Sequence, residues 1–382
     1  MRRRFICGPA AFIAAGLSCV GLAGPVAGAS GSLCTGTYGG TPRVGAPLRF
    51  GVDPGLAGSA GGVQLPAKPD RLSADVAAVR RLHPARRVLV VRLNRLFWSS
   101  GKAGIRSFER LTRRYGRAGL KVEIQVRYHP TSAENGNLRK WRAWVRHVVA
   151  VFGRFHPVVD MTITNEVNLN ASPNTSDGSY KNAEAALVQG IEAAHAQAVR
   201  RGWRRLRFGF TYAYRWNPSS DESFWQYLGA HGGRRFRRAL GFVGLDFYPG
   251  SFYPPTMVGG SYSSDTEEAL GTLRECFLPE ARIAKRTPLW ITENGVPTGA
   301  GESDDAQASA LRQLVSAVRA YSGTFHVTDY RWFNLRDSNS SATGSLPGAS
   351  DSFATDGLMT DAYEAKPSFW TYRSLIARYG RH

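Results

Sequence analysis

Two glutamates in this 382-residue chain have the residue type and the setting for acid–base chemistry. Glu166 and Glu293 each follow an apolar, β-prone run that reads as a strand ending on a carboxyl group. Two carboxyl groups delivered from two strand ends suit glycoside hydrolysis, because one donates a proton while the other acts as nucleophile or base. The alternative is that each glutamate is a solvated residue at the start of a loop. An asparagine lies beside each of them, Asn165 and Asn294, and this repeated setting favours catalysis.

The elements that would position these glutamates alternate along the chain. Short apolar runs typical of strands are followed by segments with helical periodicity, and this order predicts parallel strands joined by right-handed crossovers. The strands are predicted at residues 48–52, 88–93, 120–126, 158–164, 206–212, 242–247, 289–292 and 325–333. The helices are predicted at residues 73–79, 105–115, 138–152, 183–200, 222–228, 267–284, 304–321 and 367–379.

Eight such units predict an α/β fold, a single (β/α)8 TIM barrel over residues 48–382 with long βα loops. In such a barrel the C-terminal ends of the strands form the mouth of the active site. The Gly-rich residues 55–62 and the Ser-, Gly- and Asp-rich residues 337–356 follow the first and eighth strands. Both are therefore expected to be loops at that face.

The first residues read as a targeting signal rather than as part of the fold. Three arginines at residues 2–4 precede an apolar run at residues 10–23, and residues 27–29 fit the small-x-small cleavage rule. We therefore expect residues 1–29 to be a secretory signal peptide and residues 30–47 to be an N-terminal arm. No later run is long and apolar enough to span a bilayer. The product is expected to be secreted and extracellular, with no membrane insertion after signal cleavage.

Two cysteines remain after the expected cleavage, Cys34 and Cys276. An even pair in an exported protein favours one disulfide, which would tie the N-terminal arm to the barrel. The alternative is two unpaired thiols. Neither cysteine has a second ligand at the spacing of a metal site, and no cluster of histidine and cysteine occurs elsewhere. No metal and no cofactor is expected.

The formal net charge is +20, and nearly all of the excess comes from arginine. Nucleic-acid binding would favour a continuous basic stripe with interleaved aromatic residues, and the sequence shows none, so no nucleic-acid partner is expected. Clusters at residues 200–205 and 234–238 are expected at helix ends and loops away from the mouth. An arginine-biased composition is the simplest explanation of the charge. Attraction to an anionic glycan or to an acidic cell wall is the functional alternative.

The Asn165–Glu166 pair and Glu293 resemble the catalytic residues of the large clan of retaining (β/α)8 glycoside hydrolases that includes families 1, 5 and 39. The resemblance covers most of the chain after residue 29. It implies that Glu166 is the acid/base and that Glu293 is the nucleophile. Asn165 and Asn294, next to them in the sequence, are expected to bind substrate. Val167 stands where families 1 and 5 usually have proline. The resemblance therefore indicates the clan and singles out no family.

Other strand-end residues agree with this resemblance. Arg92 corresponds to an arginine bonded to the nucleophile, His129 to a histidine that binds a sugar hydroxyl, and Tyr248 to a tyrosine whose hydroxyl approaches the nucleophile. Alternation along the strand puts Asp246 and Tyr248 on one face, so one of them should point into the mouth. Trp332 is expected to be an apolar platform for a sugar ring. The structural alternatives are a salt bridge for Arg92, a loop position for His129 and core packing for Trp332.

Together these features predict a secreted, monomeric retaining glycoside hydrolase. It would cleave O-glycosidic bonds, with β-linked glycosides expected, in an oligo- or polysaccharide by a two-glutamate double displacement. One alternative is a non-catalytic carbohydrate-binding barrel, against which the presence of both glutamates argues. The other is a wall-associated protein that binds anionic glycans through its arginines.

Overall fold

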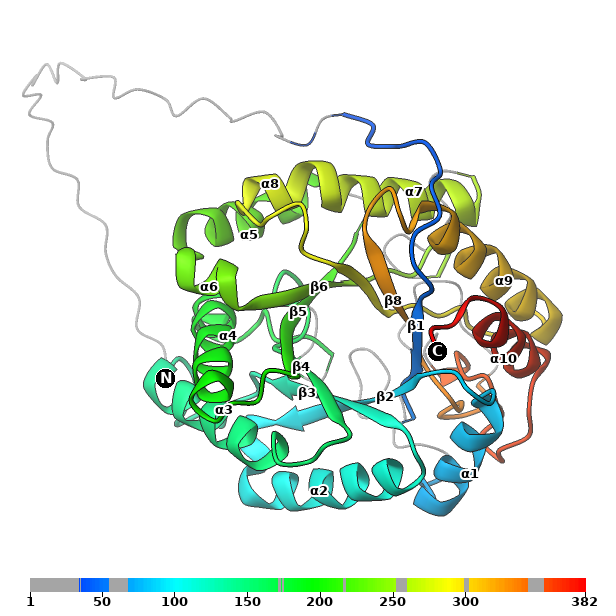
Figure 1. Ribbon diagram of the computed structural model, residues 1–382, viewed down its shortest axis with the longest axis horizontal. Coiled ribbons are helices and arrows are strands. Elements are labelled where there is room, and N and C mark those ends of the chain that lie inside the picture. The colour runs from blue at the N-terminus through cyan, green and yellow to red at the C-terminus, as the bar shows by residue number, and fades with distance from the viewer. Residues whose placement is uncertain are drawn as a thin grey trace, which may run out of the picture. The chain divides into compact units, whose positions relative to one another are not determined.

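Eight parallel strands close into a barrel in which β1 pairs with both β2 and β8 (Figure 1). The strands are β1 (Arg49–Val52), β2 (Leu89–Phe97), β3 (Lys121–Arg127), β4 (Val158–Ile163), β5 (Arg207–Ala213), β6 (Leu240–Asp246), β7 (Leu289–Glu293) and β8 (Val327–Trp332). The computed structural model describes residues 34, 36–54, 68–170, 173, 175–215, 218–251, 260–298, 302–342 and 354–382. The predicted (β/α)8 barrel is confirmed, because each of the eight predicted strands overlaps one of these strands.

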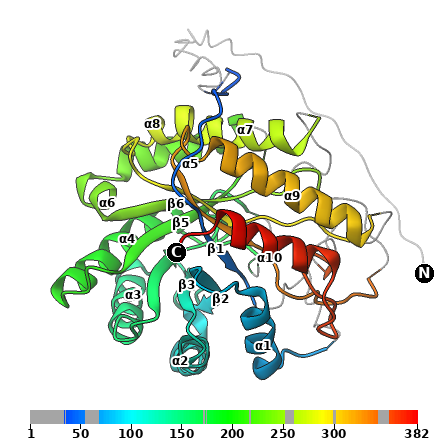
Figure 2. The ribbon, with the colours of Figure 1, turned by 45° about the vertical axis from the view of Figure 1, so that its right-hand side comes forward.

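Helices surround the barrel and cover the outer faces of its strands, and α9 and α10 lie side by side (Figure 2). They are α1 (Leu72–Leu82), α2 (Gly101–Arg117), α3 (Leu138–Phe152), α4 (Ala183–Arg200), α5 (Pro218–His231), α6 (Arg234–Ala239), α7 (Tyr262–Thr272), α8 (Leu278–Glu280), α9 (Asp304–Tyr321) and α10 (Pro367–Tyr379), with a 3-10 turn at Trp98–Ser100 and a π-helical turn at Leu273–Phe277. In α3, the Asn137 side chain caps the first turn, and the apolar residues Trp141, Val145 and Val149 are buried at helical spacing.

Two elements differ from their predicted form. Strand β2 runs on to Phe97 because a bulge between Leu93 and Leu96 restores its pairing with β3. The helix predicted at 267–284 begins earlier, at Tyr262, and reaches Glu280 through the π-helical turn. Helix α6 was not predicted, because its sequence carries four arginines and little apolar periodicity.

The described part of the N-terminal arm is bound to the outside of the barrel. A disulfide joins Cys34 to Cys276, with their Cα atoms 5.9 Å apart. Further along the arm, the Gly40 N–H donates to Glu267 at 2.9 Å. The expected signal peptide and the Gly-rich loop at 55–62 lie outside the described residues, as does much of the loop predicted at 337–356. None of the helices that the structure describes is long and apolar enough to cross a membrane.

The barrel interior near the N-terminal ends of the strands is charged. TIM-barrel interiors are usually filled by layers of branched aliphatic side chains. Here Arg49 donates to Asp329 at 2.5 Å and forms an ion pair with Asp160 at 2.7 Å. Arg331 contacts Asp329 at 3.0 Å and Glu123 at 3.2 Å. All five side chains are buried, so each charge depends on its partners for stabilisation.

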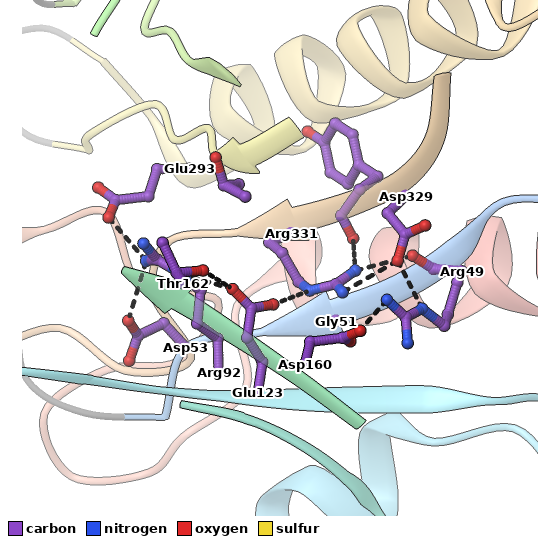
Figure 3. Close-up of polar contacts among 12 residues, drawn as sticks. Arg49, Gly51, Asp53, Arg92, Glu123, Asp160, Thr162, Glu293, Asp329 and Arg331 are labelled. Atoms are coloured by element: carbon purple, nitrogen blue, oxygen red, sulfur yellow. Dashed lines mark hydrogen bonds and ion pairs between the residues drawn. The ribbon is translucent and has the colours of Figure 1, made fainter. Parts of the chain in front are cut away.

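This ion network extends along the barrel axis to the C-terminal ends of the strands (Figure 3). Glu123 contacts Arg331 through one oxygen and lies 3.4 Å from the Arg92 Nε through the other. Arg92 in turn bonds Glu293. Gly51 makes room for this arrangement, because a Cβ atom there would lie 2.3 Å from the Cδ of Arg331. Ion pairs in the barrel core therefore connect the charged residues near the N-terminal ends of the strands to Glu293, a predicted catalytic residue.

We predict that Asp329→Asn destabilises the protein by about 3–5 kcal/mol at neutral pH, because it removes the carboxylate that Arg49 and Arg331 share and leaves these two buried charges only Asp160 and Glu123 as partners. Burial opposes ionisation, but Arg49 and Arg331 outweigh it and lower the pKa of Asp329 to about 2. The stability contributed by this carboxylate is thus complete above about pH 4, the ordinary aspartate value, and is lost as the pH falls toward about 2. Urea unfolding at several pH values measures this difference.

Glu109→Gln is the matched control, since it also removes one carboxylate from two arginines, Arg113 and Arg154. Those arginine side chains are 49% and 62% exposed, and loss of such a surface pair costs less than about 1 kcal/mol. Equal destabilisation by the two substitutions would contradict a special role for the buried network.

Candidate active site

Glu166 is held just beyond β4 by a strained segment of backbone. Thr164 and Glu166 both have positive φ angles, 68° and 45°, which residues with side chains rarely adopt. The Thr164 N–H donates to the Val126 carbonyl at 2.8 Å, and the Glu166 N–H donates to the Thr211 hydroxyl at 3.1 Å. These bonds to the neighbouring strands β3 and β5 fix the conformation. Backbone strain of this kind clusters at functional sites.

Asp177 braces the same segment, and the sequence analysis did not identify it. One of its carboxylate oxygens accepts from the Asn165 N–H and the Tyr128 N–H, both at 2.9 Å. The other accepts from Arg127 Nε at 2.8 Å. Asp177 therefore ties the end of β3 to the residue that precedes Glu166. It belongs to a loop without periodicity, so no pattern in the sequence indicated this role.

Glu293 ends β7 and is hydrogen-bonded through both carboxylate oxygens. Arg92 Nη1 donates to Oε1 at 2.7 Å, and the Tyr248 hydroxyl donates to Oε2 at 2.9 Å. These are the contacts expected for Arg92 and Tyr248. Burial alone would lower the pKa of Arg92, but Glu293, Glu123 and Asp246 raise it above its ordinary value. The guanidinium therefore stays charged and stabilises the negative charge on Glu293.

A third carboxyl group, Asp246, lies with the two glutamates. One oxygen from each of Glu166, Asp246 and Glu293 lies within 4.8 Å of the other two. The two glutamates therefore lie close enough together to act on one glycosidic bond. Asp246 and Tyr248 were expected to compete for one inward position. Both reach the site, and Asp246 was not among the predicted site residues.

The electrostatics separate the two glutamates. Burial, followed by the charges of Asp246 and Glu293, raises the pKa of Glu166 well above its ordinary value. Burial and the charge of Glu293 likewise raise the pKa of Asp246. The ion pair that Arg92 forms with Glu293 has no counterpart at Glu166 among the described residues. Glu166 is therefore suited to hold a proton, and Glu293 to act as a carboxylate.

These three carboxyl groups are also close enough to share a metal ion. The geometry does not favour one, because Arg92 and Tyr248 already bind both oxygens of Glu293. A divalent cation would have to displace the guanidinium or lie beside it, against like-charge repulsion. We therefore assign no metal ligand here.

The Asn165 side chain is fixed beside Glu166. Its oxygen accepts from Gln125 Nε2 at 2.5 Å and from the Thr211 hydroxyl at 2.9 Å. Its amide nitrogen donates to the Thr175 carbonyl at 2.7 Å and lies 3.4 Å from Glu166 Oε2. Asn165 is thus placed at the site, as its predicted role requires. That it binds substrate stays a prediction.

Asn294 points away from the site. Its amide donates to the Phe247 carbonyl at 2.7 Å, and its oxygen accepts from the Tyr330 hydroxyl at 2.5 Å. The side chain is fully buried. Strict alternation does not give this placement, because Thr292 already faces the site and bonds Asp246 at 2.6 Å; a register shift between β6 and β7 lets Glu293 face the site as well. The prediction that Asn294 contacts substrate is therefore wrong, and its side chain instead stabilises the barrel wall.

Trp332 also lies on the outer side of the barrel, and the prediction that it is a sugar platform needs correction. It is fully buried, packs near Tyr372, and donates from Nε1 to the Asp356 carbonyl at 3.0 Å. Alternation explains this placement, because Arg331 points into the barrel and its neighbour must point out. Phe333 shares the inward parity, and its ring lies 6.4 Å from that of Tyr248. Phe333 is thus the aromatic residue of this strand end that lies at the site.

His129 lies at the end of β3 among aromatic residues. Its ring is 4.4 Å from Phe97 and 5.3 Å from Tyr180, and its Nδ1 is 2.9 Å from the Ser99 hydroxyl. The side chain is partly exposed. Its binding of a sugar hydroxyl stays a prediction.

Comparison with known proteins supports the fold. No family model matches the chain, and no curated protein matches it. Solved structures do. A GH5_18 protein from Bifidobacterium longum subsp. longum shares 17% identity over 87% of this chain and 80% of its own, with a TM-score of 0.58. A GH5_18 protein from Streptomyces cattleya in complex with GlcNAc shares 16% identity over 88% and 81%, with a TM-score of 0.55.

A second group of similar structures comes from another glycoside hydrolase family. A β-glucosidase from Thermotoga maritima in complex with castanospermine shares 12% identity over 90% of this chain and 100% of its own, with a TM-score of 0.61. At these identities the likeness establishes the (β/α)8 fold. It agrees with the resemblance to more than one family of the clan, and singles out none.

We predict that Glu166 titrates above the ordinary glutamate range and that Asp246→Asn lowers its midpoint. The substitution replaces a negative charge beside Glu166 with a neutral amide, so less energy opposes ionisation of the glutamate. The measurement is a ¹³C NMR titration of carboxyl-labelled protein, with Glu166→Gln to assign the signal. Asp305→Asn, an exposed change on α9, is the control and should leave the midpoint in place. An unchanged midpoint in Asp246→Asn would refute the electrostatic coupling.

Proposed function

We propose that this chain is a secreted retaining glycoside hydrolase that cleaves O-glycosidic bonds by double displacement. Glu293 is the nucleophile and Glu166 the acid/base. The observation that carries the proposal is the unequal environment of two carboxyl groups at close spacing. Glu293 is held by Arg92 and Tyr248, whereas burial and neighbouring charge raise the pKa of Glu166. Retaining hydrolysis requires this division into a carboxylate and an acid.

In the first step, a Glu293 oxygen forms a bond to the anomeric carbon while the glycosidic bond breaks. Glu166 gives its proton to the departing oxygen, so the leaving group departs as a neutral alcohol. Arg92 and Tyr248 orient the attacking carboxylate. The product is a glycosyl ester on Glu293, which no longer carries a negative charge.

In the second step, Glu166 acts as a base. The charge of Glu293 is one cause of the raised pKa of Glu166, so forming the ester lowers the pKa of Glu166 and favours its carboxylate. That carboxylate accepts a proton from water, whose oxygen attacks the anomeric carbon and releases Glu293. Each residue is then returned to its starting state with the anomeric configuration retained.

The substrate class we propose is a β-linked glycoside. The similar structures include a β-glucosidase and a GH5_18 variant in complex with Manβ1-4GlcNAc, and both share the barrel fold with this chain. Phe333, packed edge-on against Tyr248, is the aromatic residue nearest the site on this strand end and is buried there. The support for a β-linked sugar comes from the similar structures.

Export is part of the proposal. Residues 1–29 have the composition of a signal peptide, and disulfides persist mainly in oxidising compartments. A disulfide between Cys34 and Cys276 therefore supports a protein that works outside the cell.

Glu293→Gln is expected to abolish turnover of every glycoside, because it removes the carboxylate that Arg92 and Tyr248 orient for attack. Glu166→Ala should lose less than about tenfold in kcat/KM on an aryl glycoside whose leaving group needs no proton. It should lose about 10²- to 10⁴-fold on an unactivated glycan, which is the usual contribution of general acid catalysis. Steady-state kinetics on the two substrates measure the difference.

Azide provides the second readout. Added to Glu166→Ala, it should restore turnover and give a β-glycosyl azide, because it attacks the ester without needing a base. Folding is checked by comparing urea unfolding of each variant with the unsubstituted protein. Equal losses on both substrates, together with no azide adduct, would show that the proposed roles of the two glutamates, or the proposed reaction class, are wrong. Sugar binding without any turnover by the unsubstituted protein would instead indicate a non-catalytic carbohydrate-binding barrel.

A further inference from the structure

The positive charge of this chain lies in its first 240 residues, which carry a net charge of +24. Residues 101–240 contain 24 lysines and arginines and 10 aspartates and glutamates, a net charge of +14. Residues 241–382 contain 12 lysines and arginines and 16 aspartates and glutamates, a net charge of −4. A general bias toward arginine would make both segments basic. The difference between them therefore requires another explanation than composition alone.

The basic segment forms one side of the barrel. It runs from α2 to α6, across the barrel from α9 and α10 (Figure 1). Half of its acidic side chains are buried: Glu123, Asp160, Glu166, Asp177 and Asp221. Those carboxylates cannot screen the arginines at the surface. The outer wall on this side is thus more basic than the sequence count suggests.

A hollow of about 340 Å³ lies in this wall among α3, α4 and α6. Two arginines from α3, Arg142 and Arg146, and two from α6, Arg235 and Arg238, line it. All four are exposed. Glu192 from α4 is the one carboxylate among the lining residues, so the hollow has an excess of three positive charges.

These four arginines form no ion pair in the part of the chain that the structure describes. Arg142 and Arg146 are four residues apart on α3, and Arg235 and Arg238 are three apart on α6. Like charges at such spacings destabilise a helix. On α2, in contrast, the equivalent spacing pairs Arg113 with Glu109. The hollow therefore concentrates repulsion that an anionic ligand would relieve.

We propose that this α3/α4/α6 surface binds an acidic polysaccharide. Guanidinium groups bind carboxylates and other oxyanions through paired hydrogen bonds, and four of them around one hollow suit a polymer with repeated negative charges. A nucleic acid is the less favoured polyanion, because no tryptophan, tyrosine or phenylalanine lines the hollow to stack on bases. The surface is on the outer wall of the barrel, whereas the proposed active site is at the strand ends. It would hold the protein on an anionic glycan while the active site stays open.

The test uses polygalacturonate, a polymer with one carboxylate per sugar, and measures Kd by isothermal titration. The variant carries Arg142→Gln, Arg146→Gln, Arg235→Gln and Arg238→Gln. The control removes the same charge from exposed positions on α1, α9, α10 and the C-terminus, with Arg80→Gln, Arg312→Gln, Arg378→Gln and Arg381→Gln. All proteins carry Glu293→Gln, so that the polymer is not cleaved.

At 50 mM salt we expect the surface variant to bind at least about tenfold more weakly than the parent, and the control less than about threefold more weakly. Raising the salt to 200 mM should weaken the parent at least about tenfold and the surface variant much less, because fewer counterions are released. Neutral dextran should not bind. In the Glu293-containing background, hydrolysis of a small aryl glycoside should be the same for both quadruple variants.

Three results would overturn the proposal. If polygalacturonate does not bind to the parent, it is not a ligand of this surface. If binding weakens equally in the two quadruple variants, the polymer responds to the net charge of the protein and not to this surface. Tighter binding of double-stranded DNA at equal charge concentration, lost in the surface variant, would assign the surface to nucleic acid. Failure of the hydrolysis assay alone would count against the proposed catalytic function and leave the binding result intact.

Discussion

The buried guanidinium of Arg92 is the constraint on which the site depends. Arginine does not lose its proton at ordinary pH, and a buried charge without partners is strongly destabilising. Carboxylates from three strands or strand ends therefore surround Arg92: Glu123 of β3, Glu293 of β7 and Asp53 after β1, the last at 3.8 Å. The position of Glu293 is thus fixed by the charge requirement of its neighbour as well as by the barrel. Moving the end of β7 would take from Arg92 the carboxylate that lies closest to it, at 2.7 Å.

The same charge balance explains why two chemically identical residues differ. Glu166, Asp246 and Glu293 share a small volume, and Arg92 contacts only the last of them among the described residues. A single cation at one carboxylate leaves the others to the effects of burial and mutual repulsion, which raise their pKa values. The difference arises from placement, because Glu293 has the guanidinium beside it and Glu166 is surrounded by burial and negative charge. The strained backbone at Glu166 is the local cost of that placement.

Sequence reasoning predicted the barrel and both glutamates because these depend on local patterns. Strand periodicity and a glutamate at each strand end could be expected from residue order, whereas the contacts of Arg92 and Tyr248 were implied by the resemblance to the glycoside hydrolase clan. Trp332 was wrongly predicted to face the site, because its residue type was considered and its position in the strand was not; alternation from Arg331, which points into the barrel, puts Trp332 on the outer side and Phe333 on the inner side. Asp177 could not be predicted, because its role comes from three backbone and side-chain donors that meet only in the folded loop. The ion network in the barrel interior could not be predicted either, because the sequence does not distinguish a strand arginine that points into the barrel from one that is exposed.

The two uses of charge in this protein differ in their physical range. Inside the barrel, ion pairs such as Arg49–Asp329 are shielded from solvent, so dissolved salt screens them little. On the outer wall, exposed arginines such as Arg142 interact through water, where screening acts over about 8 Å at physiological ionic strength. Ionic strength can therefore change what the outer surface attracts without changing the protonation of the carboxyl groups within. One chain can thus combine a salt-insensitive site with a salt-sensitive surface, because the fold buries balanced ion pairs inside the barrel and leaves exposed arginines such as Arg142 on the outer wall.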